Sequence, residues 1–145
     1  MQSSFADIIL PLALKTRLTY SIPVEMQGII MRGVRVLVQL RDKKVYTGVV
    51  AKVHNDTPDF ADIKPVLKVF GPDPVINNRQ LDLWKWIAEY YMCCEGEVMK
   101  AAVPAALFPE GEKDAPVIEK YKPKKETFVE LNHRFSDAEL NEIFD

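Results

Sequence analysis

Two neighbouring stretches of the chain alternate between apolar residues and other residues. Residues 34–40 (VRVLVQL) and 45–53 (VYTGVVAKV) each place an apolar side chain, or Thr47, at every second position. A period of two is typical of strands that bury one face. The polar run RDKK at 41–44 predicts a turn, so the two stretches form a hairpin with one apolar face and a basic outer face and tip. Gly48 indicates a bulge or a close approach of another backbone.

Shorter apolar segments predict further strands. Residues 5–14 (FADIILPLAL) predict an edge strand that kinks, because Pro11 is tolerated at sheet edges and bends. Residues 18–23 (LTYSIP) predict a short strand that ends at its proline, and residues 63–70 (IKPVLKVF) predict another. Together with the hairpin these segments make an antiparallel sheet.

Two helices are expected after this sheet. Asn77 or Asn78 can cap the first, which runs to about Met92, and residues 95–103 form a shorter second helix that ends at Pro104. The apolar arc of the first helix is broad, so we expect it to be buried on more than one side, with Trp84 and Trp86 in the core. The arc is built from Leu81, Trp84, Ala88 and Tyr91, widened by Leu83, Ile87 and Tyr90.

These elements predict an α+β fold. A small curved, antiparallel, barrel-like sheet spans residues 5–70, with one long and one short helix packed beside it and an extended C-terminal tail. The folded domain covers residues 1–108. Residues 109–125 are charged, contain proline and lack periodicity, as linkers do. Residues 126–145 show a strand-like segment at 127–131 and a capping box at Ser136, so they predict the truncated start of a further domain.

The charge of the chain is unevenly distributed. The whole chain carries a formal net charge of −2, which by itself argues against nucleic acid as a partner. Residues 15–52, however, hold eight basic side chains and two acidic ones, Glu25 and Asp42. The eight are Lys15, Arg17, Arg32, Arg35, Arg41, Lys43, Lys44 and Lys52. Such a local patch predicts either an anionic partner or a solvated sheet face.

Composition and motifs exclude several classes of protein. With 48% hydrophobic and 28% charged residues, the chain has the composition of a folded cytoplasmic protein. It has no apolar run of about 18 residues and no signal-peptide pattern, so we expect no membrane association. The adjacent Cys93 and Cys94 indicate a reducing compartment and no zinc site. There is no phosphate-binding P-loop, and His54 and His133 lack ligand spacing, so we expect no catalytic residue, metal or cofactor in this segment.

Several segments, in order, resemble one known family. They are LPLALKTRLTYSIP at 10–23, GVRVLV at 33–38, GVV at 48–50, IKPVL at 63–67, WIAEYY at 86–91, GEV at 96–98 and AAVP at 101–104. In this order and spacing they are similar to the N-terminal DNA-binding region of the PriA replication-restart helicases. The resemblance covers residues 5–104, and the tail resembles the lead into that family's winged-helix domain.

The resemblance implies a function. The domain would capture the 3′ end of the nascent leading strand at a stalled replication fork, within an ATP-dependent 3′-to-5′ DNA helicase of primosome assembly. ATP, Mg²⁺ and Zn²⁺ would belong to the full-length parent, and so would contacts with other primosome proteins and single-stranded-DNA-binding protein. We expect a cytoplasmic monomer that binds single-stranded 3′ ends and forked DNA.

The resemblance also implies site residues. The family's 3′-end pocket falls on Leu18 and Thr19, on Arg41 and on Lys64. This chain has Leu18-Thr19 where the family commonly has an aromatic–aspartate pair, and Arg41 where it commonly has glycine. Thr19 can still hydrogen-bond a base edge, and Tyr20 is a candidate stacking partner. The candidate phosphate contacts are Arg35, Arg41, Lys43, Lys44 and Lys64.

A second interpretation stays open from the sequence. A small barrel with an exposed edge strand can also accept a partner strand, which would make the domain a protein-interaction module of the primosome. An enzyme is the least favoured of the three alternatives. A strong salt dependence of DNA binding separates the first interpretation from the second.

Overall fold

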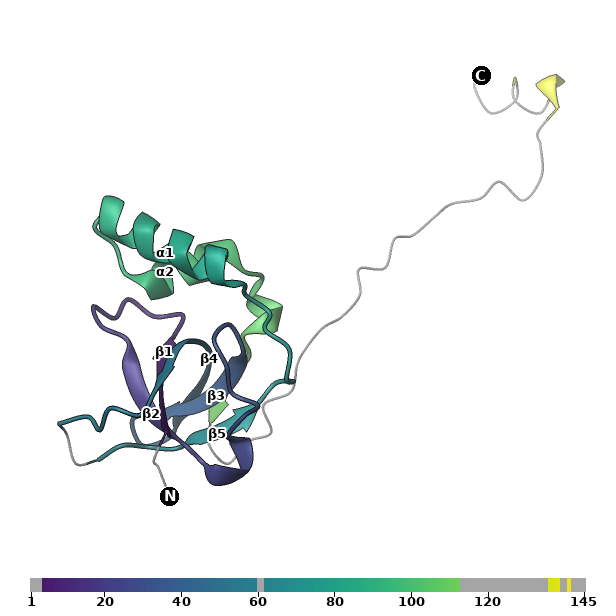
Figure 1. Ribbon diagram of the computed structural model, residues 1–145. Helices are drawn as coiled ribbons and strands as arrows, with labels where there is room; N and C mark the ends of the chain where they lie inside the picture. Colours follow the sequence, from purple (N-terminus) through teal and green to yellow (C-terminus); the bar gives the residue numbers. More distant parts are fainter. Residues whose placement is uncertain (1–3, 60–61, 113–135, 139–140, 142–145) are drawn as a thin grey trace.

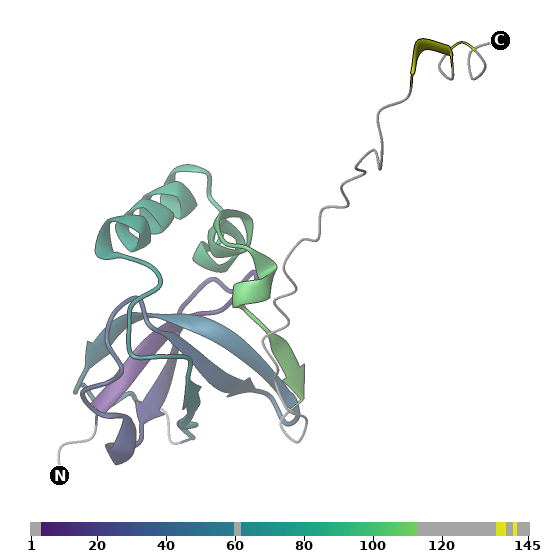
Figure 2. The same cartoon turned by 90° about the vertical axis from the view of Figure 1, so that its right-hand side faces the viewer.

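Six strands form one curled antiparallel sheet. The computed structural model describes residues 4–59, 62–112, 136–138 and 141. The strands β1 (Ser4–Ile9), β2 (Leu18–Ile22), β3 (Arg35–Leu40), β4 (Lys44–His54) and β5 (Val66–Val69) are ordered β2-β1-β4-β3-β5, and β6 (Glu110–Glu112) pairs with β4 (Figures 1 and 2). A parallel bridge between Ser21 and Pro65 joins the two outer strands β2 and β5. The sheet therefore curls into the predicted barrel-like shape, and the α+β prediction is confirmed.

The first strand does not lie at an edge of the sheet. β1 is hydrogen-bonded to β2 on one side and to β4 on the other. The prediction of an edge strand was wrong because β1 ends at Ile9, two residues before Pro11, so every residue of the strand keeps its N–H donor. Pro11 instead belongs to the connection that leads to β2.

Two apolar clusters cover both faces of the hairpin β3–β4. One cluster fills the inside of the curled sheet and includes Ile8, Tyr20, Val36 and Val50, among others. The second lies between the outer face of β1 and β4 and the helices α1 (Asn78–Tyr90) and α2 (Glu95–Ala102) (Figure 2). It contains Ile9, Val49, Ala51, Ile76, Leu81, Trp84, Ala88, Val98 and Met99. The predicted basic outer face of the hairpin was therefore wrong, since the helices cover much of it and leave the tip and Lys52 as its exposed basic parts.

A β-bulge changes the direction of side chains along β4. Asp7 of β1 lies opposite Lys52, whereas the next residue, Ile8, lies opposite Val50, so Ala51 is the extra residue. Ala51 packs beneath the helices, and Lys52, opposite Asp7, lies on the same outer face but is exposed. Gly48 is the site of the predicted close approach, since a Cβ there would lie 2.5 Å from Cγ2 of Ile8.

Helix α1 covers the sheet with one face only. Its N-terminus is fixed by a capping box in which Asn77 Oδ1 accepts from Gln80 N, at 2.9 Å, and Gln80 Oε1 accepts from Asn77 N, at 2.9 Å. The helix ends at Tyr90, two residues before the predicted end. Trp84 is buried as predicted, but Trp86 is 54% exposed, and Leu83, Tyr90 and Tyr91 on the outer side are 51%, 65% and 66% exposed. The prediction that the helix is buried on more than one side was wrong, because no described residue packs against its outer side.

Helix α2 touches the connection between β1 and β2 through a glycine. A Cβ on Gly96 would lie 2.1 Å from the carbonyl oxygens of both Leu10 and Leu12, so only glycine lets the two backbones approach this closely. Cys94 precedes the helix, and its N–H donates to Glu97 Oε2 at 2.9 Å. The helix matches the one predicted over residues 95–103.

The sheet extends beyond the predicted end of the domain. β6 pairs with Lys44–Tyr46 of β4, and Thr47 Oγ1 donates to Pro109 O at 2.6 Å. Residues 109–112 therefore belong to the fold rather than to a linker. Residues 113–125 and the predicted strand at 127–131 lie outside the described residues, and Asp137 and Ala138 are helical directly after Ser136. Among the helices that the structure describes, none is long and apolar enough to cross a membrane.

Candidate nucleic-acid interface

Three segments that are distant in sequence meet at the tip of the hairpin. The N–H of Ser21 on β2 donates to Lys64 O, at 3.0 Å, just before β5. The ammonium group of Lys64 donates to Arg41 O, at 2.9 Å, in the turn of the hairpin. Leu18, Thr19, Arg41 and Lys64 are thus carried by neighbouring segments, and the single pocket that the resemblance implies for them stays a prediction.

The turn of the hairpin is held in an uncommon backbone conformation. Arg41 has a φ of 59°, in the left-handed region that favours glycine. Gln39 Nε2 donates to the carbonyls of Arg41 and Asp42 at 2.8 and 2.9 Å. With Lys64, these bonds fix the turn and leave the side chains of Arg41, Lys43 and Lys44 exposed to solvent. We call Arg41, Lys43, Lys44 and Lys64 the hairpin-tip region.

Leu18 and Thr19 lie on opposite faces of β2. Leu18 packs against the inner apolar cluster. Thr19 lies on the outer face, where its hydroxyl donates to Asp7 Oδ1 at 2.7 Å, and the same oxygen lies 3.2 Å from His54 Nε2. Thr19 therefore lies beside the carboxylate of Asp7. Asp7 is not among the site residues that the sequence predicts. Only the strand register brings Asp7 here, so no local motif could have revealed it.

Two predicted contacts are buried. Tyr20 is 4% exposed, and its hydroxyl donates to Gln39 O at 3.1 Å. Burial raises the pKa of Tyr20 to about 12. Arg35 is 8% exposed, and its Nη1 donates to Leu107 O at 2.7 Å. The predictions that Tyr20 stacks on a base and that Arg35 contacts phosphate were wrong on placement, because both side chains point into contacts that hold the fold together.

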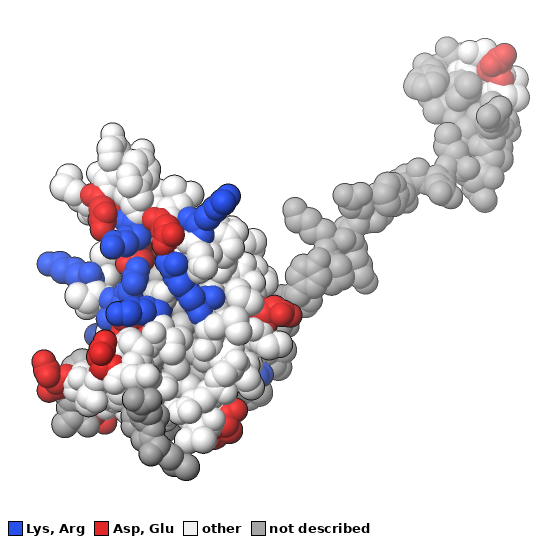
Figure 3. Space-filling model, in the orientation of Figure 1, with Lys and Arg blue, Asp and Glu red and all other residues white. Residues whose placement is uncertain are grey.

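A basic groove lies between α1 and the sheet. Figure 3 shows basic side chains gathering on this face below α1, interspersed with acidic ones. The groove has a volume of about 590 Å³ and is lined by Arg17, Arg32, Lys52 and Lys85, with Asp82 as the carboxylate in its wall. The sequence does not predict any of these four residues as a site residue, although Arg17, Arg32 and Lys52 belong to the positive stretch at 15–52.

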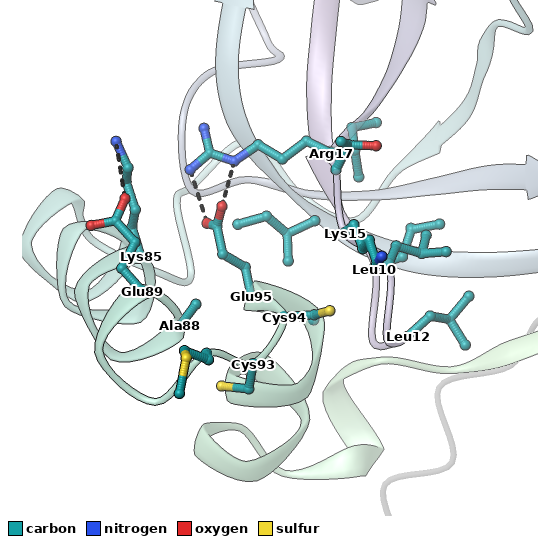
Figure 4. A pocket seen from close by; sticks show the side chains of 16 residues that line it. Leu10, Leu12, Lys15, Arg17, Lys85, Ala88, Glu89, Cys93, Cys94 and Glu95 are labelled. Carbon is teal, nitrogen blue, oxygen red and sulfur yellow. Dashed lines mark hydrogen bonds and ion pairs between the residues drawn. The ribbon is translucent and has the colours of Figure 1, made fainter.

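Ion pairs hold the arginines of this groove in place. Arg32 bonds to Asp82 and also donates from Nε to Ala51 O at 3.1 Å. Arg17 makes a bidentate contact with Glu95, at 3.0 and 2.8 Å (Figure 4). Two-point bonding of this kind fixes the plane of a guanidinium group. Both guanidinium groups are therefore held in fixed orientations by hydrogen bonds.

A second cavity of about 330 Å³ adjoins the groove and shares Arg17 and Lys85 with it (Figure 4). Its wall contains the leucines of the β1–β2 connection, and Cys93 and Cys94 line it from the α1–α2 side. Desolvation by burial and the neighbouring Glu97 raise the pKa of the Cys94 thiol, which disfavours the reactive thiolate form. Among the described residues, no three His, Cys, Asp or Glu side chains are grouped as metal ligands.

Aromatic side chains form an exposed patch on the outer side of α1. The rings of Trp86 and Tyr90 stack, with their centroids 5.1 Å apart, and Tyr91 meets Tyr90 edge-on at 4.9 Å. Tyr90 and Tyr91 are about two-thirds exposed. We call Trp86, Tyr90 and Tyr91 the aromatic patch. Exposed aromatic groups of this kind are typical of surfaces that contact other macromolecules.

The fold and its surfaces define a small curled β-sheet module with basic groups at a hairpin tip and in a groove, the class of module that binds nucleic acid. Residues 7–104 match the 3′ DNA-binding domain (3′BD) of PriA proteins, so the chain belongs to this family.

Three relatives carry the name replication restart protein PriA. The protein of Buchnera aphidicola is 31% identical over 101 residues, 69% of this chain. Those of Chlamydia trachomatis and Bacillus subtilis are 26% and 25% identical over 104 and 114 residues, 69% and 77% of this chain. The matched regions make up 14% of the length of each relative.

Proposed function

We propose that this domain captures the 3′ end of the nascent leading strand at stalled replication forks. It would do so in the cytoplasm, as the DNA-binding part of an ATP-dependent 3′-to-5′ helicase that starts primosome assembly and replication restart. ATP, Mg²⁺ and Zn²⁺ would be bound by other parts of such a helicase. The observation that carries the proposal is the match of residues 7–104 to the 3′ DNA-binding domain family.

The geometry suggests how a strand end is distinguished from an internal nucleotide. Only a strand end has a free 3′ hydroxyl, and a site that closes over this group leaves no path for a continuing chain. Asp7 on β1 offers a partly exposed carboxylate as an acceptor for this hydroxyl, and Thr19 on β2, whose O–H already donates to Asp7 Oδ1, offers its oxygen as a second acceptor. The cations of the hairpin-tip region would hold phosphates, which makes the affinity depend on salt.

The proposal is tested by fluorescence anisotropy with two short single strands of one sequence, one with a free 3′ hydroxyl and one with a 3′ phosphate. Both are measured at two salt concentrations. We expect tighter binding of the free hydroxyl, weaker binding of both strands at higher salt, and loss of the preference in Lys64→Ala. Lys100→Ala is the matched control, since Lys100 is an exposed lysine on α2 away from the hairpin tip. Equal binding of the two strands by the native domain would refute end capture.

The aromatic patch favours a second candidate function, a protein-interaction module of the primosome. A surface of stacked rings on one helix face is suited to the apolar side chains of a protein partner. Single-stranded-DNA-binding protein and other primosome proteins are the partners to test. Absence of DNA binding at low salt, together with binding of a purified primosome protein that Trp86→Ala abolishes, would favour this function over end capture.

A further inference from the structure

We propose that the basic groove between α1 and the sheet binds the sugar-phosphate backbone of the single strand whose 3′ end lies at Thr19. This inference rests on the proposed function, because it assigns the path of the same strand. It adds a contact surface built from Arg17, Arg32, Lys52 and Lys85, distinct from the hairpin-tip region.

The four cations converge from separate parts of the chain. Arg17 comes from the β1–β2 connection, Arg32 from the segment before β3, Lys52 from the bulged end of β4, and Lys85 from α1. They surround one depression whose wall holds a single carboxylate, Asp82. Glu95 and Glu89 pair with Arg17 and Lys85 from outside this lining, so four cations and three carboxylates leave a net charge of +1, which favours an anion in this groove.

The ion pairs around the groove do not prevent an anion from binding. Lys85 Nζ lies 3.8 Å from Glu89 Oε1, and both side chains are more than half exposed. Exposed pairs contribute only about 0–1 kcal/mol, so a phosphate can compete with the carboxylate for the lysine. Lys52 has no ion-pair partner within the described ranges of the chain. Arg17 and Arg32 are held by Glu95 and Asp82, and a guanidinium group has five N–H donors, so each arginine can bond to a phosphate as well as to its carboxylate.

The groove adjoins the predicted end site through Lys52, which lines the groove. Lys52 lies directly opposite Asp7 in the sheet, and Asp7 accepts the hydrogen bond of Thr19. A strand whose last nucleotide contacts Thr19 would therefore pass Lys52 and continue toward Arg17, Arg32 and Lys85. Lys52 on β4 and Thr19 on β2 are separated by β1, so their backbones lie about 10 Å apart, and Lys52 can reach the phosphate of the neighbouring nucleotide.

Size and lining favour a single strand over a duplex. A volume of about 590 Å³ is in the range of small-ligand pockets, which a nucleotide unit can enter and a rigid double helix cannot. Apolar groups also line the groove, and Met31 and Val53 are 45% and 40% exposed. Such groups can pack against sugars or base faces, whereas a duplex offers mainly phosphates at its surface.

The test is the double variant Lys52→Ala/Lys85→Ala, because both lysines are exposed and neither holds the core. Binding of the free-hydroxyl and 3′-phosphate strands is measured by anisotropy as a function of salt. We expect the affinity for both strands to fall by the same factor, so that the preference between them is unchanged. The slope of log K against log salt should become shallower by about 1.4, which is about 0.7 for each lost phosphate contact on a single strand.

Lys100→Ala again serves as the control and should leave affinity and slope unchanged. An affinity and slope equal to those of the native domain in the double variant would overturn the groove proposal. Loss of the end preference without a change in slope would also overturn it, because the lysines would then act on the strand end. If the native domain shows no end preference but the double variant still reduces the slope, end capture fails and the groove stands. A short duplex that loses as much affinity as the single strand would refute the single-strand assignment.

Discussion

Arg41 pays a conformational cost that glycine would avoid. Its φ of 59° lies in the left-handed region, which costs an L-residue with a Cβ about 1–2 kcal/mol. Glycine adopts this region freely but loses about 0.5–1 kcal/mol more backbone entropy on folding. The substitution Arg41→Gly should therefore stabilise the domain by about 0.5–1 kcal/mol. The turn should be retained, because Lys64 and Gln39 bond to the carbonyl of residue 41 rather than to its side chain.

The matched control is Arg41→Ala. This variant removes the same charge and the same side-chain contacts, but alanine still has a Cβ and keeps the unfavourable backbone conformation. We expect Arg41→Ala to be close to the native domain in stability and Arg41→Gly to be more stable than Arg41→Ala by about 1 kcal/mol. For a domain of this size, 1 kcal/mol corresponds to a rise in Tm of roughly 4–8 °C.

Urea denaturation followed by tryptophan fluorescence measures these stabilities, and anisotropy with a 3′-hydroxyl strand measures binding. If the side chain of Arg41 holds a phosphate, both variants should bind more weakly, with a salt slope shallower by about 0.7. The two effects are separable, because stability should differ between the variants while DNA affinity should not. Equal stability of Arg41→Gly and Arg41→Ala would refute the conformational argument.

Three further substitutions test the fold that supports the site. Burial raises the pKa of Tyr20 to about 12 from an ordinary value near 10, so its contribution to stability should be constant below pH 10 and be lost as the pH rises toward 12. The loss of stability is at most about 3 kcal/mol. Tyr20→Phe should remove this pH dependence in urea titrations. Asn77→Ala removes the cap of α1 and should cost about 1 kcal/mol, seen as a lower urea midpoint, whereas an unchanged midpoint would contradict the cap. Gly96→Ala places a Cβ against two main-chain carbonyls and should cost about 3 kcal/mol or prevent folding, and native-like thermal unfolding would show that α2 can shift freely.

Local patterns in the sequence predict the individual elements well. The period-two alternation predicts the hairpin, and the asparagine before the apolar arc predicts the start of α1, because both signals come from neighbouring residues. The same patterns did not predict which faces are covered. Arg35 was expected at the surface and is buried, whereas Trp86 was expected in the core and is exposed. Burial depends on helices and strands that are distant in the sequence.

The candidate site shows the same division. The resemblance placed Thr19, Arg41 and Lys64 on three segments, and the fold brings those segments together. Asp7 and Lys52 were not found, because their positions depend on the register of β1 with its neighbours and on one extra residue at Ala51. A bulge of this kind leaves no clear mark in the alternation, so only the paired strands reveal it.

The short strand β6 also determines how the domain can be shortened. β1 pairs with β4 only as far as Val49, so the first half of β4 would be a free sheet edge without Glu110–Glu112. An open edge of this kind can pair with the same edge of another molecule. A chain ending at residue 108 would therefore be prone to dimerise or aggregate through Lys44–Tyr46, which would block the hairpin tip, whereas one ending after residue 112 would keep that edge covered.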